Sequence, residues 1–246
     1  MRSIKGKFHM KGKEKFERDL DTAIARLEEV LNKEEFEDLH GLKDKLVKMR
    51  EKELVKINHS VMELVCAGYL ISNGYEVEVE VPLDEVLTCD LYARKGDGVL
   101  IVEVETGFVP PSHALDPATY SRSRIASKIA RYSRFSSKFA IGVPPYYVLQ
   151  LLPVFLEPPR IRGLEEILEA KKLCDTYYRR PPITLEEIRN ARLHTIYVID
   201  VDEGLVREVD PETYWEVLTA WGCSLTLGSA EKTLRALPKL YEKRLD

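Results

Sequence analysis

The chain has 246 residues, of which 44% are hydrophobic and 32% are charged, and its formal net charge at neutral pH is -4. This length and apolar fraction allow a sizeable buried core. The mild negative charge argues against a protein that coats nucleic acid by bulk electrostatics, so any contact with a polyanion has to be local. The high Lys and Glu content and the single glutamine, Gln150, form a composition found in heat-adapted proteins, which hints at a thermophilic source.

The N-terminal segment is basic but lacks the apolar core of a signal peptide. No apolar run approaches the roughly 20 residues that a membrane-spanning helix needs. We therefore expect a cytoplasmic protein with no membrane partner.

Residues 1–57 are rich in charge and carry apolar side chains at three- and four-residue steps, first over residues 16–30 and then over residues 39–49. This period predicts a helical hairpin. Its charged face is most simply solvated; the alternatives are a face that clamps nucleic acid, binds a protein partner or forms a homodimer.

Residues 58–157 are expected to form the core of the fold. A helical stripe begins near His59 and ends at Asn73-Gly74, which is a typical helix stop. A strand follows in which valines alternate with Glu76, Glu78 and Glu80, and these glutamates are expected to lie on a wet face. Two apolar runs around the turn KGDG predict an antiparallel hairpin, and SRSRIASKIARYSRF and KFAIGV predict a helix and a buried strand.

Residues 158–246 are expected to extend this core as an α/β region. Helices are predicted over residues 163–177, 185–193, 211–221 and 230–245, and strands over TIYVIDV and LVREV. We expect these strands to join the same sheet; a separate small subdomain is the alternative.

Three carboxylates stand inside the apolar runs of the predicted hairpin. In VLIVEVETG, Glu103 and Glu105 share one face of the strand, and Asp90 lies in the neighbouring run CDLYA. Like charges this close are costly unless a cation holds them, and a hard divalent ion is the simplest such cation. The alternative is an amphipathic strand with a wet face, which suits Glu103 poorly because its strand reads as covered on both sides.

The predicted helix after this hairpin is the most basic short stretch outside the termini. Arg124, Lys128 and Arg131 fall on one face of it at four- and three-residue steps. We interpret the helix and its end as a candidate nucleic-acid contact, formed by Arg122, Arg124, Arg131, Arg134 and Lys138. A solvated basic face is the alternative.

Residues 58–144 resemble the PD-(D/E)xK nuclease superfamily, the fold of many restriction enzymes and Holliday-junction resolvases. The resemblance rests on CDLYA, which offers Asp90 for the family Asp, on IVEVETG, which offers Glu103 for the first acidic position, and on MELVCAGYLISNGYEV, which offers Glu63 for the helix Glu. It implies a restriction-endonuclease-like mixed β-sheet core flanked by helices. The chain departs from the family at Glu105, which occupies the position of the usual lysine.

The resemblance implies a nuclease that uses Mg²⁺ or Mn²⁺ and acts on nucleic acid, DNA rather than RNA. Asp90 and Glu103 would be metal ligands, and Glu105 would be a further ligand or a base that orients water. Lys128 would replace the family lysine, and Glu63 would order water around the metal. The five histidines have no zinc-ligand spacing, so we expect no zinc site. Two alternatives remain: a catalytically inactive module of the same fold that binds nucleic acid or scaffolds a complex, and a helical interaction protein with merely amphipathic strands.

Overall fold

The computed structural model of the chain describes residues 2–52, 55 and 57–220. Its α-helices are α1 (Arg2–Ala25), α2 (Lys33–Glu51), α3 (Ile57–Ser72), α4 (Pro117–Tyr132), α5 (Leu164–Tyr177), α6 (Leu185–Asn190) and α7 (Pro211–Ala220). Its strands are β1 (Glu76–Pro82), β2 (Thr88–Lys95), β3 (Gly98–Val104), β4 (Lys138–Val143), β5 (Thr195–Asp200) and β6 (Leu205–Val209). The helix predicted over residues 230–245 lies outside the described residues.

The six strands form one mixed sheet in the order β1-β2-β3-β4-β5-β6. Strands β1, β2 and β3 form an antiparallel meander, β3, β4 and β5 run parallel, and β6 returns antiparallel to β5. The protein is therefore an α/β protein with a six-stranded mixed sheet, and the two strands of the C-terminal region extend the sheet rather than form one of their own.

The parallel centre of the sheet is covered on both faces. Almost every residue of β3, β4 and β5 is buried, as expected of strands between two helical layers. Alternate residues of β3 feed two separate cores: Ile101 packs with the α4 side, whereas Leu100, Val102 and Val104 pack with the α3 side. This confirms the two-residue strand period expected of the run VLIVEVETG over the residues of β3.

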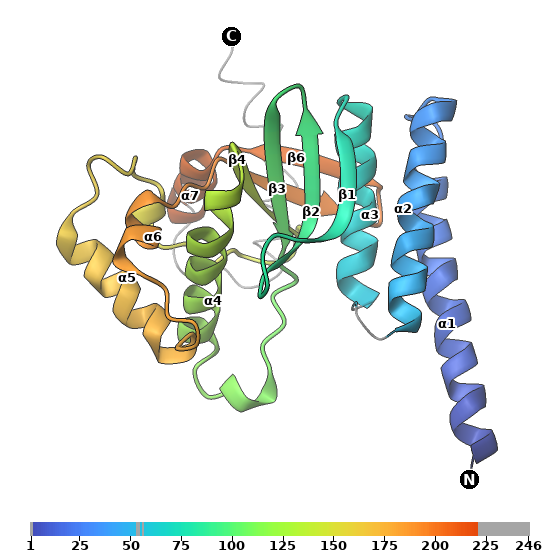
Figure 1. The fold of residues 1–246 in the computed structure, drawn as a ribbon, viewed down its shortest axis with the longest axis horizontal. Helices are drawn as coiled ribbons and strands as arrows, with labels where there is room; N and C mark the ends of the chain where they lie inside the picture. Colours follow the sequence, from blue (N-terminus) through green and yellow to red (C-terminus); the bar gives the residue numbers. More distant parts are fainter. Residues whose placement is uncertain (1, 53–54, 56, 221–246) are drawn as a thin grey trace.

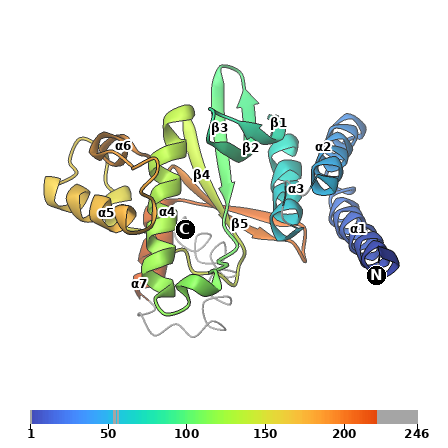
Figure 2. The same cartoon turned by 60° about the horizontal axis from the view of Figure 1, so that its bottom comes forward.

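Helices lie on both sides of the sheet in successive layers (Figure 1). Helix α3 packs against one face, and the hairpin of α1 and α2 packs against α3. Helix α4 covers the other face, with α5 and α6 outside it, and the second view shows the same layering (Figure 2). The predicted helical hairpin is confirmed, and its apolar stripe is buried against α3.

The apolar segment at residues 144–156 contains a short 3₁₀ turn, Pro153–Phe155, and its apolar side chains fill the core beside α4. One predicted helix ends earlier in the structure. Helix α6 ends at Asn190, three residues before its predicted end, since Ala191 leaves the helical conformation. Within the described residues, no helix combines the length and the apolar character needed to cross a membrane.

Candidate metal and phosphodiester site

The carboxylates of the β2–β3 hairpin lie where the two strands stop pairing through their backbones. The ladder between β2 and β3 runs from the turn to the pair Leu91 and Val102. Beyond it, the amide of Asp90 donates to Glu103 Oε1 at 3.1 Å, and the amide of Val104 donates to Asp90 Oδ2 at 2.6 Å. Each carboxylate thus replaces a backbone acceptor of the opposite strand, which fixes both side chains between the strands.

Lys128 reaches this point from α4. Its Nζ lies 3.2 Å from Glu103 Oε2, 3.8 Å from Asp90 Oδ2 and 4.0 Å from Glu105 Oε2. It also donates to the carbonyl of Val104 at 2.7 Å. Burial lowers the pKa of this amine, but the three carboxylates together outweigh burial, so the pKa of Lys128 is raised and the amine stays charged. The structure therefore brings Lys128 to the acidic cluster, as the sequence predicted.

Glu105 lies in the same buried region but is held by other groups. Its Oε2 lies 2.8 Å from Arg124 Nε, and its Oε1 accepts from the amide of Gly107 at 3.0 Å. Only 1% of Glu105 is exposed. Oε1 thus accepts a hydrogen bond, while Oε2 lies beside the guanidinium without accepting a hydrogen bond. These contacts fix the chain after β3, and the role of Glu105 as a metal ligand stays a prediction.

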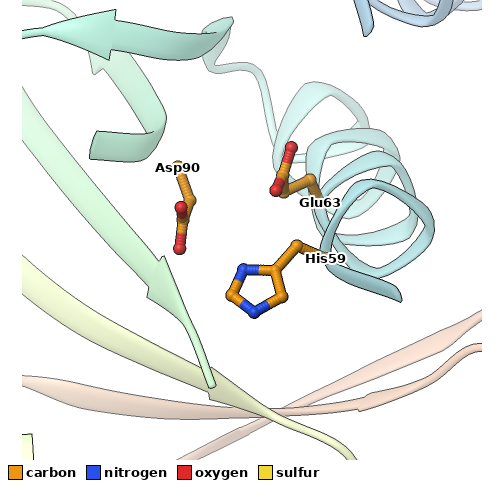
Figure 3. Close-up of side chains that lie close together, drawn as sticks. All are labelled: His59, Glu63 and Asp90. Carbon is orange, nitrogen blue, oxygen red and sulfur yellow. The ribbon is translucent and has the colours of Figure 1, made fainter. Parts of the chain in front are cut away.

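Glu63 projects from α3 toward Asp90 (Figure 3). It is fully buried, and neither of its carboxyl oxygens has a hydrogen-bond partner. Burial raises the pKa of Glu63 well above its ordinary value, and the charges of Asp90, Glu80 and Glu103 raise it further. A buried carboxyl without a partner costs folding free energy, so its presence points to a ligand that the folded chain binds.

His59 completes a three-residue group on the α3 side. It lies one helical turn before Glu63, so both side chains emerge on the same face of α3. His59, Glu63 and Asp90 each offer one ligand atom, and these atoms all lie within 4.8 Å of one another. Among the described residues, this is the group whose geometry fits one metal ion (Figure 3).

The acidic groups around Asp90 outnumber the cations. Glu80 is a fifth carboxyl: burial and the neighbouring Asp90 raise its pKa to about 7. Burial and Asp90 likewise raise the pKa of Glu103 to about 8. Among these described neighbours the partly buried cations are Lys128, Arg124 and Lys45, so the cluster favours either retained protons or an added cation. Two carboxylates and an imidazole are a donor set suited to Mn²⁺ and related ions, while Mg²⁺ prefers oxygen ligands alone.

The proposed metal ligands therefore divide into two groups. Asp90 was predicted as a ligand, and it also belongs to the group with His59 and Glu63 whose geometry fits one ion. Glu103 and Glu105 lie beside Asp90 but face Lys128 and Arg124. Their direct coordination of an ion stays a prediction.

The basic residues predicted to contact nucleic acid do not gather on one surface. Arg124 pairs with Glu105, whereas Arg131 donates to the carbonyl of Pro181 in the segment between α5 and α6. Arg134 pairs with Asp84 and Glu187. Arg122 is exposed on α4, and Lys138 is exposed at the start of β4, the end of the parallel strands opposite to Val104. The predicted common face of Arg124, Lys128 and Arg131 is thus divided between the site and the α5–α6 layer.

Two residues of the site were not selected from the sequence. His59 lies one turn before Glu63, from where it could approach the site, but a histidine in that position more often caps or packs, and its partner Asp90 lies on a different element. Glu80 belongs to a regular alternation of valine and glutamate that predicted a wet face, yet it has a positive φ of 49° and is partly buried near Asp90. A local break in the strand, which alternation does not reveal, turns it toward the site.

Neither protein-family models, nor curated proteins, nor solved structures give a significant match to this chain. The function is therefore inferred from the site itself.

Proposed function

We propose that this protein is a divalent-metal-dependent nuclease that hydrolyses phosphodiester bonds, in DNA rather than RNA, on a core of the restriction-endonuclease type. The observation that carries the proposal is Glu63: a fully buried carboxyl with no hydrogen-bond partner, aimed at Asp90 and next to His59. A chain retains such a costly group when the group binds something.

The residues present fit a metal ion. His59, Glu63 and Asp90 would hold it, and Mn²⁺ or Mg²⁺ bound there lowers the pKa of a coordinated water and offsets negative charge on a phosphate. Asp90 is already oriented by the Val104 amide, so little ordering is needed on binding.

Lys128 and Glu103 provide the remaining chemistry of the site. The Lys128 ammonium is held charged by the acidic groups around it and would stabilise the charge that develops on the phosphate oxygens during in-line attack. The Glu103 carboxyl, with a pKa of about 8, can exchange a proton near neutral pH and would move a proton between the attacking water and solvent or the leaving oxygen. In this arrangement Lys128 takes the part of the lysine that the resembling family carries where this chain has Glu105.

One observation favours a second function, a catalytically inactive module that binds nucleic acid or scaffolds a complex. The ion pair of Glu105 with Arg124 occupies the position of the family lysine, so the usual cation beside the attacking water is absent there. Under this alternative, calorimetry would detect no binding of Mn²⁺ or Mg²⁺, and nucleic-acid or partner binding would not change when Asp90 is replaced by alanine.

A cleavage panel tests the proposal. Plasmid, single-stranded, flapped and junction DNA, with one RNA of matched sequence, are incubated with Mg²⁺ or Mn²⁺ and analysed on gels, and Mn²⁺ binding is measured by calorimetry. We expect metal-dependent cleavage of at least one DNA substrate and stronger binding of Mn²⁺ than of Mg²⁺. Cleavage that persists in a chelator, or no binding of either ion, would contradict the proposal.

The raised pKa of Glu103 predicts how stability changes with pH in the absence of metal. The folded state keeps the Glu103 proton up to about pH 8, whereas the unfolded chain releases it near 4.5. The folded state therefore binds more protons in this window, and the contribution of Glu103 to stability is present below pH 4.5 and is lost as the pH rises toward 8. Relative to Glu103→Gln, which has no proton to lose, the wild-type protein should lose on the order of a few kcal/mol of unfolding free energy between pH 5 and pH 8.

Urea unfolding of both proteins in a chelator at several pH values measures this difference. Glu78→Gln, at a half-exposed position on β1, is the control: it keeps Glu103 and should lose unfolding free energy between pH 5 and pH 8 as the wild type does. The raised pKa would be ruled out if the difference in unfolding free energy between the wild type and Glu103→Gln is constant with pH, or if the wild type gains stability relative to the variant as the pH rises.

A further inference from the structure

A cavity of about 570 Å³ opens at the carboxyl ends of β3, β4 and β5, beside the carboxylate cluster. Residues from five places line it, among them Asp19 of α1 and Arg26 just after it, Met62 of α3, Phe108 and Tyr146 of the segments that follow β3 and β4, and Asp202 after β5. Ligands of open parallel sheets bind in the crevice outside the carboxyl ends of the strands. The volume is within the range of small-molecule sites.

Two aromatic side chains in this cavity are left open to solvent. Phe108 is 59% exposed and Tyr146 is 52% exposed, although both belong to segments that pack against a well-buried core. Single exposed apolar residues are common on protein surfaces. Two exposed rings that line the same cavity instead provide flat apolar surfaces for a planar ligand.

The segment that carries Phe108 is held in place from both sides. Gly107 has a φ of +77°, and a Cβ there would lie 2.4 Å from the Tyr147 ring, so this turn requires glycine. The Gly107 amide donates to Glu105, and the carbonyl of Phe108 accepts from Arg124 Nη1 at 2.8 Å. The Glu105–Arg124 ion pair thus ties Phe108 to the end of β3, which gives this pair a role in fixing the cavity wall.

The charges of the cavity favour a neutral ligand over an anion. Asp19 and Asp202 contribute two carboxylates, while the guanidinium of Arg26 donates to the carbonyl of Val201. A phosphate would be repelled by the two acids. A nucleobase offers N–H donors to the carboxylates and a flat ring to the aromatic side chains.

Two chain segments contribute residues both to the cavity and to the proposed metal site or the carboxylates beside it. Met62 lines the cavity and Glu63 points to the metal site, and Thr106 lines the cavity directly after Glu105. We propose that this cavity receives one unpaired base of the DNA strand whose backbone lies at His59, Glu63 and Asp90, which makes single-stranded DNA, or a single-stranded segment next to a duplex, the substrate. This inference rests on the proposed nuclease function, because it assumes that the backbone of the same DNA strand is bound at the metal site. A paired base cannot enter, since its face and edge are covered by its neighbours and its partner.

The test uses a single-stranded 12-mer with 2-aminopurine at successive positions and the same 12-mer in a duplex. Binding to the full-length protein is followed by anisotropy and by 2-aminopurine fluorescence with Ca²⁺ in place of Mg²⁺ or Mn²⁺, and gels check that the oligonucleotide stays intact. We expect the single strand to bind more tightly than the duplex and the fluorescence of one position to be quenched by stacking. Phe108→Ala and Tyr146→Ala should each weaken single-strand binding at least about fivefold and remove the quenching, because stacking on an aromatic ring contributes about 1–3 kcal/mol per base.

Leu115→Ala is the matched control, because Leu115 is fully exposed and lies outside the cavity lining. It should change neither affinity nor quenching, and thermal melts confirm that all three variants fold. The inference is overturned if the single strand and the duplex bind equally and lose affinity equally, if no position is quenched, or if neither oligonucleotide binds.

The two proposals fail separately. Metal-dependent cleavage of duplex plasmid at equal rates by the wild type and Phe108→Ala would leave the nuclease function standing and remove the base cavity. Quenching that depends on Phe108, with no cleavage in the presence of any metal, would leave the base-binding cavity standing and remove the nuclease function.

Discussion

Asp90→Asn should lower the metal-dependent cleavage rate by at least about a thousandfold while leaving the fold intact. The Asp90 carboxylate belongs to the group that includes His59 and Glu63, and it also lies 3.8 Å from the Lys128 ammonium. Its loss removes one negative ligand from the ion, and a bound metal contributes several kcal/mol to a phosphoryl-transfer transition state. Asparagine keeps one oxygen that can accept from the Val104 amide, so the link between β2 and β3 survives.

The measurement is a single-turnover cleavage assay with Mn²⁺, combined with calorimetric titration of the ion and urea unfolding. Asp97→Asn is the control, because Asp97 lies exposed in the turn at the other end of the same hairpin. It should retain wild-type cleavage and metal affinity. An Asp90→Asn protein that still cleaves within tenfold of the wild-type rate would exclude Asp90 as a metal ligand.

Most helices and strands of the fold could be predicted because each has a strong local signal in the sequence. The alternating valines of β1, the turn between β2 and β3 and the three- and four-residue steps of α1 and α2 each follow from the geometry of one element. The uniform apolar run of β3 also identified Glu103 as an anomaly, since an acidic residue in a strand covered on both faces needs a partner. The structure supplies that partner as Lys128.

The parts of the site that escaped prediction depend on contacts between elements distant in sequence. Nothing near Asp90 indicates that β2 stops pairing there or that His59 of α3 lies within reach. Helical spacing placed Arg131 with Arg124 and Lys128, but the Pro181 carbonyl draws it toward the α5–α6 layer. Spacing along one helix gives the face of a side chain, and packing of the next layer then decides which group that side chain meets.

Glu105 shows the same limit at the level of chemistry. The sequence gives its face on β3, and the resemblance gives the position it occupies, yet both suggest a ligand. The structure adds contacts that neither one shows, to Arg124 and to the Gly107 amide, while coordination of an ion by Glu105 stays a prediction. A carboxylate at the end of a strand can thus fix the following loop, and in this protein that loop carries the exposed ring of Phe108.

Replacing Glu63 by methionine should make the metal-free protein more stable and abolish metal binding. The Glu63 carboxyl is fully buried without a hydrogen-bond partner, and its raised pKa reflects the cost of charging it there. Methionine has a similar unbranched shape and no polar atom that needs a partner. The free energy of unfolding of the Glu63→Met protein, measured in a chelator at pH 8, should therefore rise by about 1–3 kcal/mol, which is the cost of an unsatisfied buried polar group.

The same substitution removes one of the three groups that fit a metal, so affinity for Mn²⁺ should fall at least about a hundredfold. The rise in melting temperature that Mn²⁺ gives the wild type should then disappear. Glu76→Met, on the exposed face of β1, is the control and should change neither property, since its ion pair with Arg94 is solvent-exposed. Calorimetry and urea unfolding separate the two effects. Greater stability together with lost metal affinity marks a carboxyl kept for its ligand; lower stability with unchanged metal affinity would instead mean that Glu63 serves the packing of α3 and that the metal lies elsewhere.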